Sequence, residues 1–142
     1  MHMISAKRCA HADDTQGRYP SKLLVLRSWL MLLHVETIMH IGSLTAVRCL
    51  VQKHAVHPAT TQRVTSLCQA IDLACVFYFK QVLCLQRSAA TVLLLRRYGW
   101  DAALVIGGQI LPFESHAWVE LQGAVVNDKP YVHDIYRVLE RC

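Results

Sequence analysis

Residues 84–99 read CLQRSAATVLLLRRYG, and the expected arrangement of the rest of the chain follows from them. The stretch predicts a helix over residues 83–98, with Gly99 placed as its C-terminal cap. Two arginines fall in the last turn, where positive charge suits the helix dipole. Cys84 is therefore expected at the start of this helix.

The hydrophobic period changes after this helix. ALVIGG (103–108), SHAWVEL (115–121) and GAVVND (123–128) are short segments with strand composition, and a glycine separates the last two. YVHDIYRVL (131–139) fits either a strand or a helix, and we expect a strand. The C-terminal part is therefore predicted to form a small antiparallel sheet.

The segments before Cys84 have the helical period. Apolar residues recur at gaps of three and four over residues 22–52, which indicates an amphipathic helix. The Gly-Ser pair at 42–43 is a point at which it could divide in two. A further helical stretch is expected from 62 to about 80, with Thr60 or Thr61 as its N-terminal cap.

Helices followed by an antiparallel sheet define an α+β fold. We expect a single domain over residues 21–142, with a helical part at 21–80 and the helix that begins at Cys84 plus the sheet at 81–142. Residues 1–20 are polar and are expected to be mobile.

Composition narrows the functional class. An apolar fraction of 54% with only 18% charged residues is typical of an ordered, compact protein. The formal charge of +5 is carried by scattered Lys and Arg, without a basic stripe interleaved with aromatic residues. Nucleic-acid binding is therefore not expected.

The cysteines indicate the cellular compartment in which the protein is expected. The chain has six cysteines, but its first 20 residues contain no apolar segment typical of an export signal. We therefore expect free thiols and a cytoplasmic protein. The longest apolar stretch, 23–33, is interrupted by Arg27 and Ser28 and is too short for a transmembrane span.

Cys84 is the candidate nucleophile. The N-terminus of a helix presents unpaired N–H groups and partial positive charge, which favour a thiolate and can bind a developing oxyanion. His116 is the candidate base. If Leu121, Gln122 and Gly123 form a three-residue turn, the register places His116 opposite Asp128, which would orient the imidazole. A two-residue turn would shift that register by one.

These motifs resemble the transglutaminase-like cysteine peptidases that remove leader peptides in lasso-peptide biosynthesis. The shared features are C-L-x-R-S-x-A at the helix start, L-L-R-R-x-G at its end, H-A-W-V-E, and G-x-V-x-N-D, all within residues 84–128. The resemblance implies a transglutaminase/papain-like fold in which Cys84 is the nucleophile, His116 the base and Asp128 the orienting carboxylate.

The resemblance also implies the reaction and its partners. The substrate would be a ribosomally made precursor peptide, cleaved through an acyl-enzyme without a cofactor. An asparagine-synthetase-like cyclase, which uses ATP, would close the ring afterwards. A leader-binding element normally offers an open β-edge, and the helical pattern before Cys84 lacks one. We therefore expect the leader-binding element to be a separate protein. It could dock on the N-terminal helices; alternatively, these helices only cover the sheet and the Cys84 helix.

Other residues allow two readings. Trp118 could line the substrate cleft or pack in the core, and Arg87 could contact substrate, although Arg87 and Ser88 more simply brace the helix start. Asp128 could be a turn residue before Lys129. Cys68 and Cys75 fit a core face of a helix. The spacing of Cys49, His54 and His57 matches no standard zinc site. His133 and Asp134 would point to opposite faces of a strand, so they are not expected to pair.

Two other functions use the same residues differently. One is acyl transfer to an amine, as in transglutaminases or arylamine acetyltransferases, where only the second nucleophile changes. The other is a non-catalytic scaffold within a maturation complex, which the presence of Cys84, His116 and Asp128 argues against.

Overall fold

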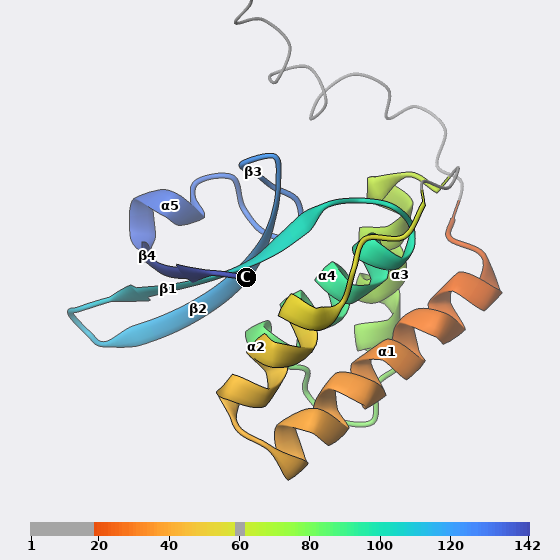
Figure 1. Cartoon of the computed structure of the whole chain (residues 1–142), viewed down its shortest axis with the longest axis horizontal. Helices are drawn as coiled ribbons and strands as arrows, with labels where there is room; N and C mark the ends of the chain where they lie inside the picture. Colours follow the sequence, from red (N-terminus) through yellow and green to blue (C-terminus); the bar gives the residue numbers. More distant parts are fainter. Residues whose placement is uncertain (1–18, 59–61) are drawn as a thin grey trace, which may run out of the picture.

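The computed structural model describes residues 19–58 and 62–142. Residues 1–18 of the segment expected to be mobile lie outside this description, as do the cap candidates Thr60 and Thr61. In the described part, helices come first and an antiparallel sheet follows, so the α+β expectation is confirmed (Figure 1). The elements are α1 (Lys22–Ile41), α2 (Leu44–Lys53), α3 (Val64–Val76), α4 (Cys84–Arg97), β1 (Ala102–Gln109), β2 (Glu114–Leu121), β3 (Ala124–Val125), α5 (Val132–Ile135) and β4 (Arg137–Arg141).

The first helical segment divides where its sequence allowed. α1 ends at Ile41 and α2 begins at Leu44, so the Gly-Ser pair at 42–43 is the break. A Cβ atom on Gly42 would lie 2.5 Å from Cβ of Ala46, so the two helices meet too closely for any side chain there. The stretch expected to be helical to about residue 80 ends earlier, at Val76.

α1 is longer than the apolar stretch within it suggested. Its 20 residues are, by length and composition alone, sufficient to cross a membrane, although the core helix of a soluble protein passes the same test. Here α1 packs against α3 and α4, and it buries Leu24, Leu32 and Val35 in the main core. Its exposed side carries other leucines, including Leu26 and Leu30.

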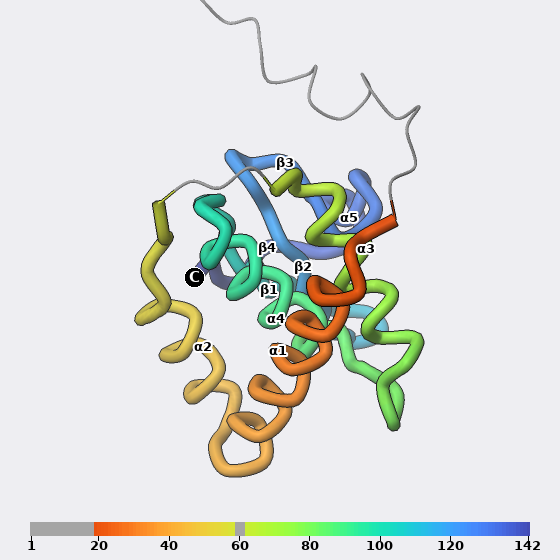
Figure 2. Tube along the Cα trace, turned by 90° about the vertical axis from the view of Figure 1, so that its right-hand side faces the viewer, coloured from red at the N-terminus to blue at the C-terminus, as the bar shows by residue number. Residues whose placement is uncertain are grey.

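α4 is the central element of the fold. It packs on α1 and α3 and on β1 and β2, so it lies between the helical layer and the sheet (Figures 1 and 2). This position explains its apolar sequence, since every residue from Ser88 to Leu95 is buried. Its far end is held by Arg96, whose guanidinium donates hydrogen bonds to the carbonyls of Ala102 at 2.8 Å and Cys142 at 3.3 Å.

The sheet has the strand order β3-β2-β1-β4, and every neighbouring pair is antiparallel. Alternate residues of β2 face opposite sides. Ala117 and Val119 pack in the main core against the helices, whereas Trp118 packs in a second cluster with Val105 and Val132. Alternation places His116 on the Trp118 side, in agreement with their stacked rings, whose centroids are 6.2 Å apart.

The expectation of a single strand over residues 131–139 is wrong. Residues 132–135 form the short helix α5, and the strand β4 begins only at Arg137. Pro130 precedes the turn, and the N–H of Tyr136 donates to the carbonyl of Val132 at 3.0 Å. Val132 is buried against Trp118, so the helical turn is set by a tertiary contact that the local pattern does not reveal.

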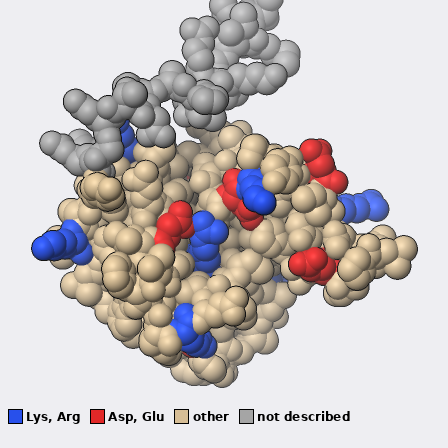
Figure 3. Space-filling model, turned by 180° about the vertical axis from the view of Figure 1, so that it is seen from behind, with Lys and Arg blue, Asp and Glu red and all other residues tan. Residues whose placement is uncertain are grey.

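Charged side chains are dispersed over the surface. On the face seen in Figure 3, Lys and Arg form separate small groups, several next to Asp or Glu, on a largely uncharged surface. Two of the ion pairs join distant segments, Arg48 with Glu140 and Arg87 with Asp72. The first pair connects α2 with β4, and the second connects α4 with α3.

Candidate active site

Cys84 is the first residue of α4, as the sequence predicts. The residue before it, Leu83, is extended (φ −82°, ψ 159°) and its side chain makes no capping hydrogen bond. The thiol is free and partly buried. The N-cap residue therefore leaves the first-turn N–H groups of α4 uncapped, and Cys84 is the first residue of this turn.

His116 and Asp128 are in direct contact. Nε2 of His116 lies 2.5 Å from Oδ2 of Asp128, and about a quarter of each side chain is exposed. The other carboxylate oxygen, Oδ1, accepts the backbone N–H of Lys129 at 2.7 Å. Asp128 therefore contacts His116 and is also a turn residue, so the two roles that the sequence allowed for it are compatible.

The surroundings of Asp128 keep it ionised. Burial acts to raise the pKa of this carboxyl, but the hydrogen bonds from His116 and from the Lys129 N–H outweigh burial. The positive charges of His116 and Arg87 act in the same direction, so the pKa of Asp128 lies below its ordinary value. A charged carboxylate at this position can hold the imidazole in one orientation.

The route by which the pair forms differs from the expected one. The turn after β2 contains two residues, Gln122 (φ 51°) and Gly123 (φ 82°), and Leu121 pairs with Ala124. The expected three-residue turn is therefore wrong, and the strand register does not place His116 opposite Asp128. Instead β3 ends at Val125, and Asp128 reaches His116 from the loop that follows.

Tyr136 is a site residue that the sequence reasoning missed. Its ring stacks on the His116 ring, with centroids 5.0 Å apart and planes 29° from parallel. Burial raises the pKa of the Tyr136 phenol, and the acidic groups of Glu114, Cys84 and Asp128 add to this effect. Tyr136 thus lies near both the cysteine and the His–Asp pair. No pattern marked it, because it follows the unexpected helix α5.

Cys84 lies close enough to Tyr136 to affect its electrostatics. Within residues 19–58 and 62–142, its Sγ forms no hydrogen bond to His116. One helical turn later, Ser88 Oγ donates to the carbonyl of Ala117, the residue after His116, at 2.9 Å. Cys84 therefore lies four residues before the point where Ser88 of α4 bonds to β2, which is about 6 Å along the helix axis. Catalytic hydrogen bonds often close only when substrate is bound.

The two candidate substrate-binding residues have structural partners. Trp118 is fully buried, its ring N–H donates to Glu120, and a Cβ on Gly107 would lie 2.6 Å from the Trp118 ring. This burial favours core packing over contact with substrate. Arg87 donates two hydrogen bonds to Asp72 on α3, which fits the bracing role.

The remaining candidate groups are accounted for individually. His133 lies 3.2 Å from Glu120 rather than paired with Asp134. Burial raises the pKa of the Cys68 thiol to about 12 and also raises that of Cys75, in keeping with core positions. In the described part of the chain, no cluster of three or more His, Cys, Asp or Glu side chains is arranged to hold a metal ion.

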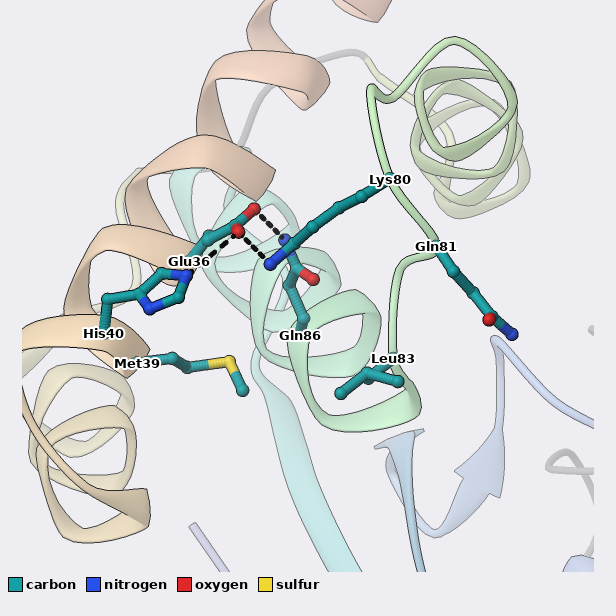
Figure 4. Close-up of a pocket in the computed structure, with 7 residues that line it drawn as sticks. All are labelled: Glu36, Met39, His40, Lys80, Gln81, Leu83 and Gln86. Carbon is teal, nitrogen blue, oxygen red and sulfur yellow. Dashed lines mark hydrogen bonds and ion pairs between the residues drawn. The ribbon is translucent and has the colours of Figure 1, made fainter.

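A cavity of about 480 Å³ lies beside the start of α4 (Figure 4). Glu36 is at its wall, where its carboxylate accepts hydrogen bonds from Tyr78 at 2.5 Å and Gln86 at 3.3 Å and forms an ion pair with Lys80. Burial acts to raise the pKa of Glu36, but Lys80, Tyr78 and His40 lower it from 4.5 to about 2. Apolar walls come from Met39 and Leu83.

The geometry agrees with comparisons to known proteins. Residues 29–141 match the family model of the transglutaminase-like superfamily. The chain is also similar to the Microcin J25-processing protein McjB of Escherichia coli, with 45% identity over 56 residues. That match covers 39% of this chain and 27% of the relative. No solved structure matches. Because the family model spans most of the chain, the protein belongs to the transglutaminase-like superfamily.

Proposed function

We propose that the protein is a cysteine peptidase that removes the leader from a ribosomally made lasso-peptide precursor. The observation that carries this proposal is the hydrogen bond between His116 and Asp128. The strand that holds His116 is bonded to the helix that begins with Cys84. The local similarity to a microcin-processing protein supports the substrate class. The reaction would take place in the cytoplasm.

In the proposed mechanism, Asp128 holds Nε2 of His116, and Nδ1 is the base. Nδ1 takes the proton of the Cys84 thiol while Sγ attacks the carbonyl carbon of the scissile bond. The backbone N–H groups at the start of α4 stabilise the oxyanion. The imidazolium then protonates the leaving amine, the C–N bond breaks, and the leader remains as a thioester on Cys84. Water, deprotonated by Nδ1, releases the leader carboxylate and restores the thiol.

The cavity beside α4 would receive a precursor side chain close to the scissile bond. Leu83 and Gln86 flank Cys84 in sequence and line the cavity, so a peptide crossing the helix start can reach both places. Because the Glu36 carboxylate is neutralised by Lys80, the cavity favours an uncharged guest. The walls combine apolar Met39 with the Gln86 amide.

Two proteins would act with this chain. Between residues 19 and 83 the described part contains helices and no strand, so the β-edge on which a leader could add is not found there. A separate leader-binding protein would supply it. An asparagine-synthetase-like cyclase would then close the ring of the released core peptide.

The test is direct cleavage of a precursor. The chain, the leader-binding protein and the precursor are incubated together, and the products are identified by mass spectrometry. We expect one cut, abolished by Cys84→Ala and retained by the control Cys49→Ala, whose thiol is exposed on α2. Retained cleavage by Cys84→Ala would refute the proposal.

The same assay separates the competing acyl transfer. A primary amine is added in excess, and the new C-terminus of the leader is weighed. A free carboxylate supports hydrolysis, whereas an amide formed with the added amine in preference to water supports a transferase.

A further inference from the structure

A buried polar bridge joins the helix of Cys84 to the strand and loop of the His–Asp pair. Ser88 Oγ donates to the Ala117 carbonyl at 2.9 Å, and Asn127 Nδ2 donates to Ser88 Oγ at 3.0 Å. Oδ1 of Asn127 accepts the backbone N–H of Val119 at 2.7 Å. Ser88 is 1% exposed and Asn127 is 8% exposed.

The direction of every hydrogen bond in this bridge is fixed. The N–H of Val119 can only donate, so the oxygen of the Asn127 amide must face it and the NH₂ group must face Ser88. The Ser88 oxygen then accepts from Asn127, and its single proton goes to the carbonyl of Ala117. Neither side chain can change partner without leaving a buried polar group unpaired.

Each member of the bridge lies next to a candidate catalytic residue. Ser88 is one helical turn beyond Cys84 on α4, Ala117 follows His116, and Asn127 precedes Asp128. Asn127 also sets the path of the chain. The last backbone bond beside β3 runs from the Val126 N–H to the Val119 carbonyl, and the Asn127 side chain then takes the place of the next ladder bond.

We propose that Ser88 and Asn127 are positioning residues, which fix the distance between the Cys84 thiol and the His116 imidazole. The proposal rests on the proposed peptidase function. Neither side chain contacts substrate in this role; both act through the backbone on which His116 and Asp128 are placed. Because a displacement of about 1 Å can lower a rate about 100-fold, a bridge of this kind governs turnover more than substrate binding.

The kinetic test uses the full chain with its leader-binding partner and the precursor. We expect Ser88→Ala and Asn127→Ala each to lower kcat at least tenfold, with KM changed less than twofold. The double variant should lose little more than either single variant, because the bridge acts as a unit. The matched control is Thr91→Val. Thr91 is also buried on α4, but its hydroxyl donates only to the Arg87 carbonyl of the same helix, at 2.8 Å.

A second readout needs no substrate. The rate at which iodoacetamide labels Cys84 is measured against pH for the wild type, Ser88→Ala, Asn127→Ala, Thr91→Val and His116→Ala. Trypsin releases Cys84 within the peptide 81–87, which contains no other cysteine. We expect the bridge variants to shift the labelling profile towards that of His116→Ala, while Thr91→Val keeps the wild-type profile.

The outcomes separate the two proposals. If the bridge variants label like the wild type, or lose activity only in proportion to the folded fraction seen by circular dichroism, the positioning role is overturned. If the wild type labels as expected but never cleaves a precursor, the peptidase function fails and the positioning role stands on the labelling profiles. Where the wild type does cleave the precursor, a bridge variant with wild-type kcat overturns the positioning role.

Discussion

Asp128 contacts His116 through Nε2, at 2.5 Å, so Nδ1 is the ring nitrogen that does not contact this carboxylate. The carboxylate is itself fixed through its second oxygen by the Lys129 N–H. The imidazole is therefore held on one side by a charge and on one face by the Tyr136 ring.

Replacing His116 should be more damaging than replacing Asp128. We expect His116→Ala to lower kcat/KM nearly as much as Cys84→Ala, because the base is lost. Asp128→Asn should be milder, since the amide oxygen can still accept from Nε2 although the charge is lost. Steady-state kinetics on the precursor decide this. If Asp128→Asn were as active as the wild type, the charge of Asp128 would have no role in the mechanism.

The buried Glu36 should make the fold sensitive to acid. Its pKa is lowered from 4.5 to about 2, so its stabilising effect is complete above pH 4.5 and is lost as the pH falls towards about 2. Thermal unfolding between pH 2 and 7 should therefore show a steeper acid decline in wild type than in Glu36→Gln. Asp101→Asn, at an exposed position, is the control and should keep the wild-type slope.

The two-residue turn after β2 should respond to backbone preference alone. Gly123 has φ 82°, and nothing lies within 4 Å of the place where its Cβ would be. We therefore expect Gly123→Ala to lower the free energy of unfolding by about 1–2 kcal/mol, through conformation rather than collision. Gln122→Asn, at φ 51°, should raise it, because asparagine before glycine suits this turn. Urea denaturation measures both free energies, and a stabilising Gly123→Ala or a destabilising Gln122→Asn would count against the observed turn.

Filling the cavity beside α4 should weaken substrate binding without slowing chemistry. We expect Met39→Trp to raise KM at least tenfold while kcat stays within threefold, because ground-state and transition-state binding are lost together. Leu26→Trp, on the exposed side of the same helix, is the control. An unchanged KM for a correctly folded Met39→Trp variant would exclude the cavity as a subsite.

The protein alone should be a slow peptidase. We expect addition of the leader-binding protein to raise the rate of precursor cleavage well beyond tenfold, since the described helices before Cys84 offer no strand to pair with a leader. The rates are compared at low precursor concentration, where binding limits turnover. Efficient cleavage without the partner would contradict this expectation and leave the roles of Cys84 and His116 unaffected.

Much of the fold could be predicted because each long element has a clear period. The helix that begins at Cys84, the break at Gly42 and the strands β1 and β2 all follow from local pattern. Residues 132–135 could not be predicted, because they are helical through the burial of Val132 against Trp118, a contact between segments 14 residues apart.

The candidate site could likewise be predicted only in part, because contacts between distant segments complete it. The sequence brings His116 and Asp128 together, but through a register that the chain does not adopt. Contact arises because Asn127 ends the strand pairing with its side chain, and the loop then carries Asp128 to the imidazole. An asparagine directly before the aspartate was visible in the motif, yet only the packing reveals that its amide is buried and bonded at both ends.

The enclosure of α4 has a consequence for how the chain folds. Ala89 and Val92 to Leu95 are covered by α1 and α3 from one side and by the sheet from the other, so neither layer alone can exclude water from this helix. Folding should therefore be one cooperative transition rather than two. A fragment ending near residue 80 would leave its apolar surface uncovered, and one starting there would lack half of the packing around α4. We therefore expect neither fragment to fold on its own.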